Sequence, residues 1–435
     1  MNIGIFSDTH LGFLEGTERE QESFDNCKQA IEIFIKEKVD AILLLGDVFH
    51  INVPSQETLF KAFQLFSLTK SQANSNLSIL RVKNSKEEKI NFSGIPIIAI
   101  HGTHEHRARD YRNVLDIFHE TGHIVYIHAG YALLDNGKEK LAVHGIGGIP
   151  EKHALDAFKA WNPKPVKGAR NVLLFHQSFK EFLPFDDPMI ATLSLDDMPR
   201  DFDLIINGHL HWSNELKLGD KTTFLLTGST VMTQMKKLEA EKPKGVHFYD
   251  TLTGRLSFIP LPVQRKLFYH KIEFKDSTPK QILDELAKAI ETDLKQKLEL
   301  KPMLRLKLHG TLAKGYTNAD VDLSEIERKY GEKTIMSLEK NFETISFKKK
   351  IEELRHLQQS KKSISAIGLD ILEKNLDEAS FKREFDARRL FEVLTTEKEL
   401  DKAMAIVLES KGQVAETKQA SVTVEKKKTS LAEFA

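Results

Sequence analysis

Acidic and imidazole side chains follow apolar stretches at five places in the sequence, and their types and spacing suit metal binding. The stretches end in Asp8-Thr9-His10, Asp47-Val48-Phe49-His50, His104, His176 and His209-Leu210-His211. Carboxylate oxygens and imidazole nitrogens are donors that suit Mn²⁺, Fe²⁺ or Zn²⁺. A single Asp-x-His would more often be a cap beside a solvated histidine, but the recurrence of the pattern favours a shared metal site.

Two ions are expected rather than one, because the set holds more ligands than a single tetrahedral ion accepts. A carboxylate such as Asp47 can bridge two ions about 3.5–4 Å apart, which is the geometry of two-metal phosphoester cleavage. Such a pair lowers the pKa of a shared water and neutralises the phosphate and the departing oxyanion. The sequence has no Gly-x-Ser-x-Gly segment, which argues against a hydrolase with a serine nucleophile.

The elements that carry these groups are predicted to form a parallel sheet. Residues 3–6 and 39–45 are apolar stretches typical of buried strands, and the amphipathic stretch 18–38 between them predicts a helix. A strand–helix–strand unit of this length has parallel strands, so the groups that follow them are expected to converge at one edge. Further strands are expected at 95–100, 124–127, 140–143, 171–175, 203–207, 223–227, 245–249 and 255–261.

The fold class is therefore expected to be α/β (α+β by strict class). Two more amphipathic helices are predicted at 55–68 and 109–121, whereas the polar stretch 70–93 is expected to be an exposed, irregular insertion. The first domain is expected to span 1–262. Three further regions are predicted, an α+β module, a charged helical region and a disordered tail, at 263–344, 345–411 and 412–435.

Composition sets limits on the partners. The 435 residues include 63 Lys and Arg and 63 Asp and Glu, so nucleic-acid binding cannot be argued from overall charge. Arg107 and Arg109 form a local basic cluster that is interpreted either as a phosphate-binding site or as a solvated loop. Cys27 stands alone, which fits a reducing cytoplasm. No apolar stretch approaches the ~18 residues that cross a bilayer, and no membrane partner is expected.

The order of these motifs resembles the calcineurin-like metallophosphoesterases. Within them the chain resembles the Mre-eleven/SbcD family of DNA double-strand-break repair nucleases, in its archaeal form. The most telling segments are Ser7-Asp8-Thr9-His10-Leu11-Gly12 and Gly46-Asp47-Val48-Phe49-His50. The resemblance implies a β-sandwich nuclease domain flanked by helices, a small DNA-capping domain, and a C-terminal helical region that binds an ATPase.

The resemblance also implies roles for single residues. It assigns one Mn²⁺ to Asp8, His10, Asp47 and His211, and a second to Asp47, His176 and His209. Mg²⁺, Fe²⁺ and Zn²⁺ are not excluded. The catalytic residues would be two histidines that hold no metal. His104 would orient the phosphate or stabilise the transition state, and His50 would help to protonate the leaving group.

One position departs from the family pattern. The family usually has asparagine before the histidine that corresponds to His104, and its side-chain oxygen binds the second metal; this chain has Thr103. A threonine hydroxyl is shorter and a poorer ligand. Either water completes the shell, or Glu105 leans in, or the second site is weak. We predict weaker affinity for the second metal.

The activity implied by the resemblance is manganese-dependent cleavage of DNA ends, as a 3′-to-5′ exonuclease on duplexes and an endonuclease on single strands and hairpins. A homodimer is also implied, with helices 55–68 and 109–121 as candidates for the interface. The implied partner is an SMC-like ABC ATPase called Rad-fifty or SbcC, bound through 345–411. The location would be the nucleoid-associated cytoplasm of a prokaryote. The alternatives are another calcineurin-like phosphodiesterase or phosphatase, or a DNA-end-binding scaffold with little cleavage activity.

Overall fold

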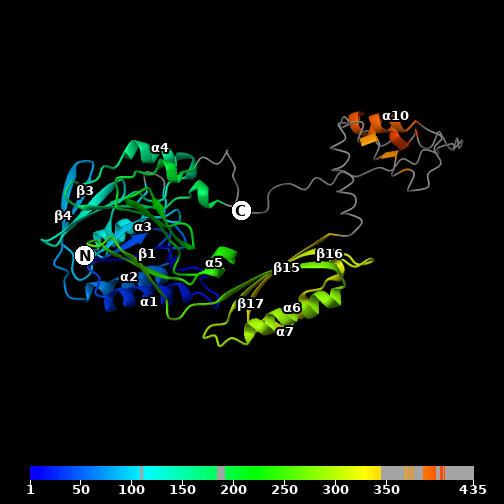
Figure 1. Ribbon diagram of the computed structural model, residues 1–435, viewed down its shortest axis with the longest axis horizontal. Coiled ribbons are helices and arrows are strands. Elements are labelled where there is room, and N and C mark those ends of the chain that lie inside the picture. The colour runs from blue at the N-terminus through cyan, green and yellow to red at the C-terminus, as the bar shows by residue number, and fades with distance from the viewer. Residues whose placement is uncertain are drawn as a thin grey trace, which may run out of the picture. The chain divides into compact units, whose positions relative to one another are not determined.

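The computed structural model (Figure 1) describes residues 1–107, 111–183 and 192–343, together with short stretches of the C-terminal part at 368–369, 372–373, 376, 386–397, 402–404 and 406. The chain divides into two compact units, Met1–Phe342 and Glu343–Ala435. Among the described residues, no helix has the length and apolar character needed to cross a membrane.

The first unit contains a six-stranded sheet in the order β14-β13-β1-β2-β5-β6. Neighbouring strands from β1 to β6 run parallel, so their carboxyl ends share one edge, as predicted. The strands are β1 (Asn2–Phe6), β2 (Ala41–Leu45), β5 (Ile97–Ile100), β6 (Val125–Tyr126), β13 (Gly245–Asp250) and β14 (Leu256–Pro260).

The second sheet has eight strands in the order β11-β12-β10-β9-β8-β7-β3-β4. Strands β8, β9, β10 and β12 run parallel to their neighbours in this set, so their carboxyl ends also meet at one edge. The strands are β3 (Ser78–Lys83), β4 (Lys86–Ile90), β7 (Gly130–Asp135), β8 (Lys140–Gly145), β9 (Arg170–Phe175), β10 (Leu204–Asn207), β11 (Ser213–Leu218) and β12 (Thr222–Thr227).

The expectation of an irregular insertion at 70–93 is wrong, because β3 and β4 form a hairpin there. Asn84 and Ser85 join the two strands, and both have a left-handed φ, of 49° and 59°. A two-residue turn with positive φ at both positions matches the twist of a hairpin. Strand β4 is the sheet edge and is largely exposed, so its polar sequence Lys86–Ile90 conceals the strand from a search for apolar runs.

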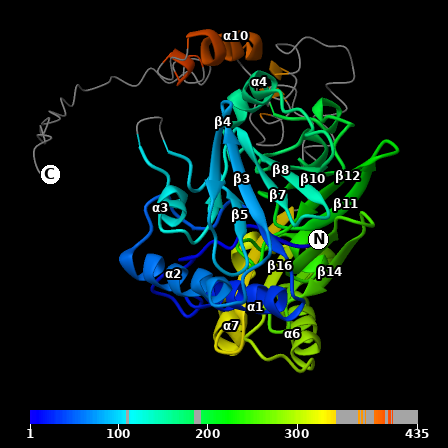
Figure 2. The same ribbon diagram turned by 90° about the vertical axis from the view of Figure 1, so that its left-hand side faces the viewer.

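Helices and sheets form the layers of an α/β sandwich, which confirms the expected fold class. Helices α1 (Glu22–Lys36), α2 (Gln56–Lys70) and α3 (Val114–Glu120) cover one sheet, and α4 (Glu151–Trp161) packs on the other (Figure 2). In β2, Ile42 and Leu44 face the helices whereas Leu43 and Leu45 face the second sheet. Both faces are buried, which explains why such strands are apolar throughout.

Capping residues set where two of the predicted helices begin. Helix α2 begins after Ser55, whose hydroxyl accepts a hydrogen bond from the Thr58 amide at 3.1 Å. Helix α3 begins later than the expected residue 109, because Asn113 and Asp116 form a capping box in front of Val114. Residues 108–110 lie outside the described part of the chain.

A smaller sheet in the order β15-β16-β17 lies within residues 267–343, with α6 and α7 on one face (Figure 1). Thr278 caps α6, Pro279 is the first residue of the helix, and Gln281 completes a capping box. The elements are β15 (Leu267–Ser277), α6 (Pro279–Leu294), β16 (Met303–Leu312), α7 (Ser324–Tyr330) and β17 (Ile335–Glu343). The exact boundaries 1–262 and 263–344 stay predictions.

The second unit is described only in part. Helix α10 (Ala387–Glu392) continues into a π-helical turn at Val393–Glu397. Most of the predicted helical region 345–411 lies outside the described residues, as does the whole of the predicted tail 412–435.

Candidate metal centre

The candidate metal centre lies where the carboxyl ends of the two sheets meet. The chain leaves β1 through Asp8 and His10, with φ of 51° and 44°, and leaves β2 through Asp47, with φ of 45°. His209, which follows β10, has φ of 69°. Left-handed φ is costly for residues other than glycine, and such strain gathers at functional sites. All four of these residues were predicted as metal ligands.

Two glycines let the strand ends of the opposing sheets approach each other. A Cβ atom on Gly46 would lie 2.6 Å from the Gly102 amide nitrogen and 2.7 Å from Nδ1 of His176. A Cβ atom on Gly208 would lie 2.4 Å from the hydroxyl of Ser7 and 2.5 Å from the carbonyl oxygen of Leu45. Neither position has room for a side chain, so glycine brings the donor-bearing loops together.

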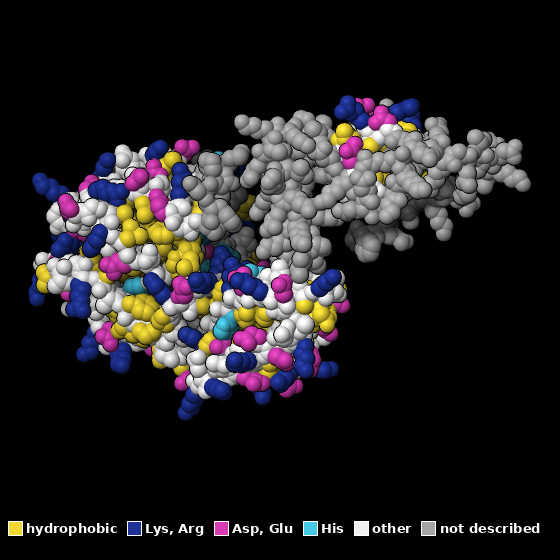
Figure 3. Space-filling view, turned by 45° about the vertical axis from the view of Figure 1, so that its right-hand side comes forward, with side chains coloured by type: hydrophobic (Ala, Val, Ile, Leu, Met, Phe, Trp, Pro, Cys, Tyr) yellow, Lys and Arg dark blue, Asp and Glu magenta, His cyan; other side chains and the backbone are white. Residues whose placement is uncertain are grey.

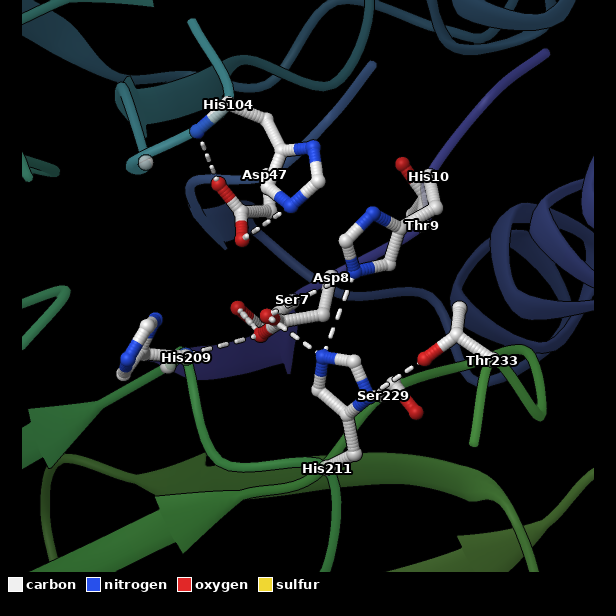
Figure 4. Close-up of polar contacts among 12 residues, drawn as sticks. Ser7, Asp8, Thr9, His10, Asp47, His104, His209, His211, Ser229 and Thr233 are labelled. Carbon is white, nitrogen blue, oxygen red and sulfur yellow. Dashed lines mark hydrogen bonds and ion pairs between the residues drawn. The ribbon is translucent and has the colours of Figure 1, made fainter. Parts of the chain in front are cut away.

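One donor cluster joins Asp8, His10 and His211, whose ligand atoms all lie within 4.8 Å of one another (Figure 4). The Nε2 atoms of His10 and His211 are 3.2 Å apart. Oδ1 of Asp8 lies 4.0 Å from Nε2 of His10 and 3.6 Å from Nε2 of His211. Three donor atoms from two sheets therefore converge on one small space.

A second cluster joins Asp47, His176 and His209, again with ligand atoms within 4.8 Å. Oδ2 of Asp47 lies 3.0 Å from Nε2 of His176. The ring of His176 is oriented by its Nδ1, which is 2.6 Å from the carbonyl oxygen of Leu45. Nε2 of His176 also lies 4.0 Å from Oδ1 of Asp8, so the two clusters adjoin.

Two buried atoms in these clusters have no hydrogen-bond partner. They are Oδ1 of Asp8 and Nε2 of His176, and the latter has the ion-pair contact with Asp47 described above. The other carboxylate oxygen of Asp8 accepts hydrogen bonds from the hydroxyl of Ser7 and from the amide of His209, so only Oδ1 is left open. Buried polar atoms are ordinarily paired, and a cation is the partner that an acidic oxygen and an imidazole nitrogen share. The donor set therefore fits divalent metal ions.

Burial keeps three of the imidazoles neutral. It lowers the pKa of His10 to about 3 and of His209 to about 4, and it lowers that of His211 well below the usual value. Nitrogen ligands must be unprotonated to bind a metal. Burial also raises the pKa of Asp8 to about 7. Burial opposes protonation of His176 too, but the carboxylates of Asp47 and Asp8 outweigh it and raise that pKa to about 10.

His50 and His104 stand on the open side of the centre, next to His10. The ring centroids of His104 and His10 are 4.9 Å apart, and those of His50 and His104 are 5.2 Å apart. Nδ1 of His104 contacts the carbonyl oxygen of His50, and its Nε2 lies 3.9 Å from Oδ2 of Asp47. The side chain of His104 is 37% exposed, so an outside molecule can reach it.

The structure bears on how the ligand shell of the second metal could be completed beside Thr103, because it shows where Glu105 lies. Glu105 is fully buried, and its two oxygens accept hydrogen bonds of 2.7 Å each from the amides of Phe49 and Gly102. It holds these loops together and does not lean toward the donor clusters. The hydroxyl of Thr103 lies 3.5 Å and 3.4 Å from the two oxygens of Asp47.

Of the two arginines predicted to hold DNA phosphates, only Arg107 is described, and Arg109 lies outside the described residues. The guanidinium of Arg107 lies 5.2 Å from the ring centre of Tyr111, and its Nη1 donates to the carbonyl oxygen of Asn52 at 3.4 Å. Arg107 thus follows His104 by three residues in sequence and contacts Asn52, which follows His50 by two.

The sequence reasoning missed the residues that orient the donors. The hydroxyl of Thr233 lies 2.6 Å from Nδ1 of His211 (Figure 4). The hydroxyl of Ser178 lies 3.1 Å from Nε2 of His209. Thr233 does not follow a strand directly, and Ser178 follows β9 but has a hydroxyl in place of an acidic or imidazole group. No signal in a single sequence identifies them, because their contacts arise only when distant loops pack together.

The comparison with known families agrees with this geometry. Residues 1–213 match the calcineurin-like phosphoesterase family. This part of the chain is similar to the calcineurin-like phosphoesterases. The structure of YfcE, a phosphoesterase from E. coli, aligns with 60% of this chain and 100% of its own, at 12% identity and a TM-score of 0.28.

Two relatives extend the similarity beyond the phosphoesterase domain. The double-strand break repair protein mre-11 of Caenorhabditis elegans is 28% identical over 312 residues, which are 61% of this chain and 41% of the relative. The DNA double-strand break repair protein Mre11 of Thermoplasma acidophilum is 26% identical over 318 residues, which are 71% of this chain and 77% of the relative. The matched part thus spans less than half of the nematode protein.

Proposed function

We propose that this chain is a metal-dependent DNA nuclease that works in double-strand-break repair. The observation that carries the proposal is the pair of adjoining donor clusters, in which Oδ1 of Asp8 and Nε2 of His176 are buried without a hydrogen-bond partner. The phosphoesterase family match and the relatives named for double-strand-break repair support the choice of a phosphodiester substrate in DNA.

Two divalent cations would be held by residues of both sheets, and Mn²⁺ is the proposed metal. Asp8, His10, Asp47 and His211 would hold one cation, and Asp47, His176 and His209 would hold the other. When bound, such a pair supplies a water of lowered pKa and positive charge against the phosphate. Burial holds the imidazoles of His10, His209 and His211 neutral. Hydrogen bonds to Leu45 and Thr233 fix the rings of His176 and His211.

His104 and His50 are the proposed catalytic residues. His104 is partly exposed and reaches toward the carboxylate of Asp47, so its ring can contact a phosphate oxygen of a bound strand. His50 lies beyond it, in ring contact with Phe13 at 5.0 Å, where it can pass a proton to the departing oxygen. We propose 3′-to-5′ exonuclease action on duplexes and endonuclease action on single strands and hairpins.

Local positive charge is the proposed means of holding the DNA backbone. On the face that Figure 3 shows, Lys and Arg side chains are interspersed with Asp and Glu rather than gathered over one region. Binding would therefore depend on the metal centre and on nearby cations such as Arg107 and Arg109. Phosphate contacts carry no sequence information, so cleavage is expected to depend little on sequence and binding to weaken as salt rises.

The remaining parts of the proposal concern assembly. Phe60 on α2 and Ile117 on α3 are 58% and 48% exposed, and large exposed apolar side chains support a homodimer through these helices. Residues 263–344 would act as the DNA-capping domain. Residues 345–411 would bind an SMC-like ABC ATPase of the Rad-fifty or SbcC type, near DNA in a prokaryotic cytoplasm.

An end-labelled duplex assay tests the activity. Wild-type protein with Mn²⁺ is expected to shorten the labelled strand, and chelation is expected to stop it. His104→Gln is expected to lower the rate by about 10²–10⁴-fold, because removal of a positioned catalytic group has effects of this size. Mn²⁺ binding by this variant should stay near the wild-type level, since His104 is not among the proposed ligands.

Other outcomes would point to other functions. Hydrolysis of small phosphodiesters without any cleavage of DNA would indicate a different calcineurin-like phosphodiesterase. Tight binding to DNA ends without Mn²⁺-dependent cleavage would indicate a scaffold. Either result would contradict the proposed nuclease.

A further inference from the structure

A buried lysine lies behind the first donor cluster. Lys244, immediately before β13, is 4% exposed. Its ammonium donates to the carbonyl oxygen of His211 at 2.7 Å, to the hydroxyl of Ser229 at 2.8 Å and to Oε2 of Glu239 at 2.7 Å. An ammonium has three protons, so each of them has one acceptor. Lys244 thus ties α5 (Lys237–Glu241) to the backbone of a proposed metal ligand.

The carboxylate of Glu239 faces the ring of the same ligand. Its Oε1 lies 3.9 Å from Nδ1 of His211, is buried, and has no hydrogen-bond partner. The hydroxyl of Thr233 lies closer, at 2.6 Å from the same Nδ1. The Nδ1 side of the ring is therefore lined by two oxygens, whereas the Nε2 side faces Asp8 and His10.

The loop that carries Thr233 is held from several sides. The hydroxyl of Ser229, which accepts from Lys244, donates to the carbonyl oxygen of Val231 at 2.7 Å. From the other side, Asn26 on α1 donates to the carbonyl oxygen of Thr230 at 2.8 Å. The position of Thr233 against His211 is therefore set by a connected network and not by one contact.

We propose that Lys244 and Glu239 act as a positioning pair for the cation site formed by Asp8, His10 and His211. This inference rests on the proposed metal-dependent function. With two oxygens on its Nδ1 side, the ring of His211 carries its proton there and presents the Nε2 lone pair to the cation. The carboxylate of Glu239 stabilises the positive charge that the ring acquires on binding. Lys244 fixes the position of Glu239 relative to the backbone of His211.

The alternative is that the pair only fastens α5 to β13. The two readings differ in what happens when both charges are removed together. Replacing a buried ion pair with apolar side chains of similar size is often neutral or stabilising, whereas removing one partner leaves an unpaired charge. A double variant therefore separates the effect on metal binding from the effect on folding.

The experiment measures Mn²⁺ binding to the full chain by calorimetry, and the spin coupling of the bound Mn²⁺ pair by electron paramagnetic resonance. Lys244→Met combined with Glu239→Met is expected to keep the wild-type unfolding midpoint. One of its two sites should bind Mn²⁺ about 10–100-fold more weakly, as for lost outer-shell partners of metal ligands, and the coupled signal should fade. Thr233→Val should weaken Mn²⁺ binding at the same site. Thr233→Ser keeps the hydroxyl and should bind Mn²⁺ as tightly as the wild type.

The matched control is Arg170→Met. Arg170 opens β9 at the end opposite His176 and pairs with Asp203 at 2.9 Å, so its removal deletes an ion pair without touching the centre. Mn²⁺ binding by this variant should match the wild type.

Wild-type Mn²⁺ affinity and a normal coupled signal in a folded double variant would overturn the inference. If the double variant does not fold, Glu239→Gln replaces it, because glutamine keeps the size of the side chain and an acceptor oxygen but loses the charge. Unchanged Mn²⁺ binding by Glu239→Gln would again overturn the inference. Wild-type protein that binds no Mn²⁺ would overturn the proposed function instead.

Discussion

Thr103 is the residue at which this chain departs from the family it resembles, and its hydroxyl lies beside Asp47. We predict that Thr103→Asn raises the affinity of the second Mn²⁺ by on the order of tenfold, because an amide oxygen on a longer side chain can reach a cation that Asp47 shares. Calorimetric titration with Mn²⁺ measures the change.

Thr103→Val serves as the control for that substitution, because it removes the hydroxyl and adds no donor. It should leave the second Mn²⁺ no tighter than in the wild type. Equal affinity and equal activity in wild type and Thr103→Asn would show that the threonine does not weaken the site.

At the residue scale, the donors could be predicted and their supports could not. Asp8 and His176 each stand where an apolar strand ends, so the sequence pattern alone placed them at the sheet edge. Lys244 and Thr233 reach His211 from loops more than twenty residues away in sequence. Such contacts depend on tertiary packing, for which a single sequence has no local pattern.

At the element scale, the start of α6 gives a direct test of local sequence signals. Thr278→Ala removes the side chain that accepts from the Gln281 amide and breaks the capping box. We predict a loss of about 1 kcal/mol in the free energy of unfolding, measured with urea, because one exposed helix end loses its cap. Thr278→Ser keeps the hydroxyl and should recover most of the stability. Mn²⁺ binding should not change in either variant.

The elements that the sequence predicted well share one property, which is burial on both faces or on one clear stripe. Strand β2 is apolar throughout because it lies between helices and a second sheet. The sequence did not predict the β3–β4 hairpin, because β4 is an exposed edge strand whose side chains are mostly charged. Its signal lay instead in the Asn84-Ser85 turn, which allows the left-handed backbone found there.

At the scale of the whole first unit, a buried carboxylate links the smaller sheet to the phosphoesterase domain. Oε2 of Glu22 accepts from Nε of Arg19 at 2.7 Å and from Nε of Arg265 at 2.9 Å. Arg265 also contacts the carbonyl oxygen of Lys301, and Arg19 donates to that of Met232 at 2.7 Å. One acidic side chain thus pairs with two buried guanidinium groups from separate parts of the fold.

We predict that Glu22→Leu lowers the free energy of unfolding by about 3–5 kcal/mol, because it leaves buried charges without a partner. Urea unfolding followed by circular dichroism measures the loss. Glu32→Gln on the same helix breaks only the exposed pair with Lys28 at 3.8 Å, and should change stability by less than about 1 kcal/mol. Equal stability of the two variants would contradict the role given to Glu22.

The proposed homodimer gives a test at the same scale. Phe60→Glu places a charge in the centre of the proposed contact on α2, and we predict a shift from dimer to monomer in light scattering after size-exclusion chromatography. Phe258→Glu changes an exposed phenylalanine on β14 and should leave the dimer intact. A wild-type protein that is already monomeric, or a Phe60→Glu variant that stays dimeric, would rule out this interface.

Each of the two proposed cation sites takes residues from both sheets: Asp8 and His10 meet His211, and Asp47 meets His176 and His209. These two proposed sites are therefore complete only when the two halves of the sandwich have docked. Bound metal would connect the two sheets. The midpoint of thermal unfolding of the protein should therefore rise with Mn²⁺ concentration. Binding of the proposed metal ions would therefore depend on correct folding of both halves of the sandwich.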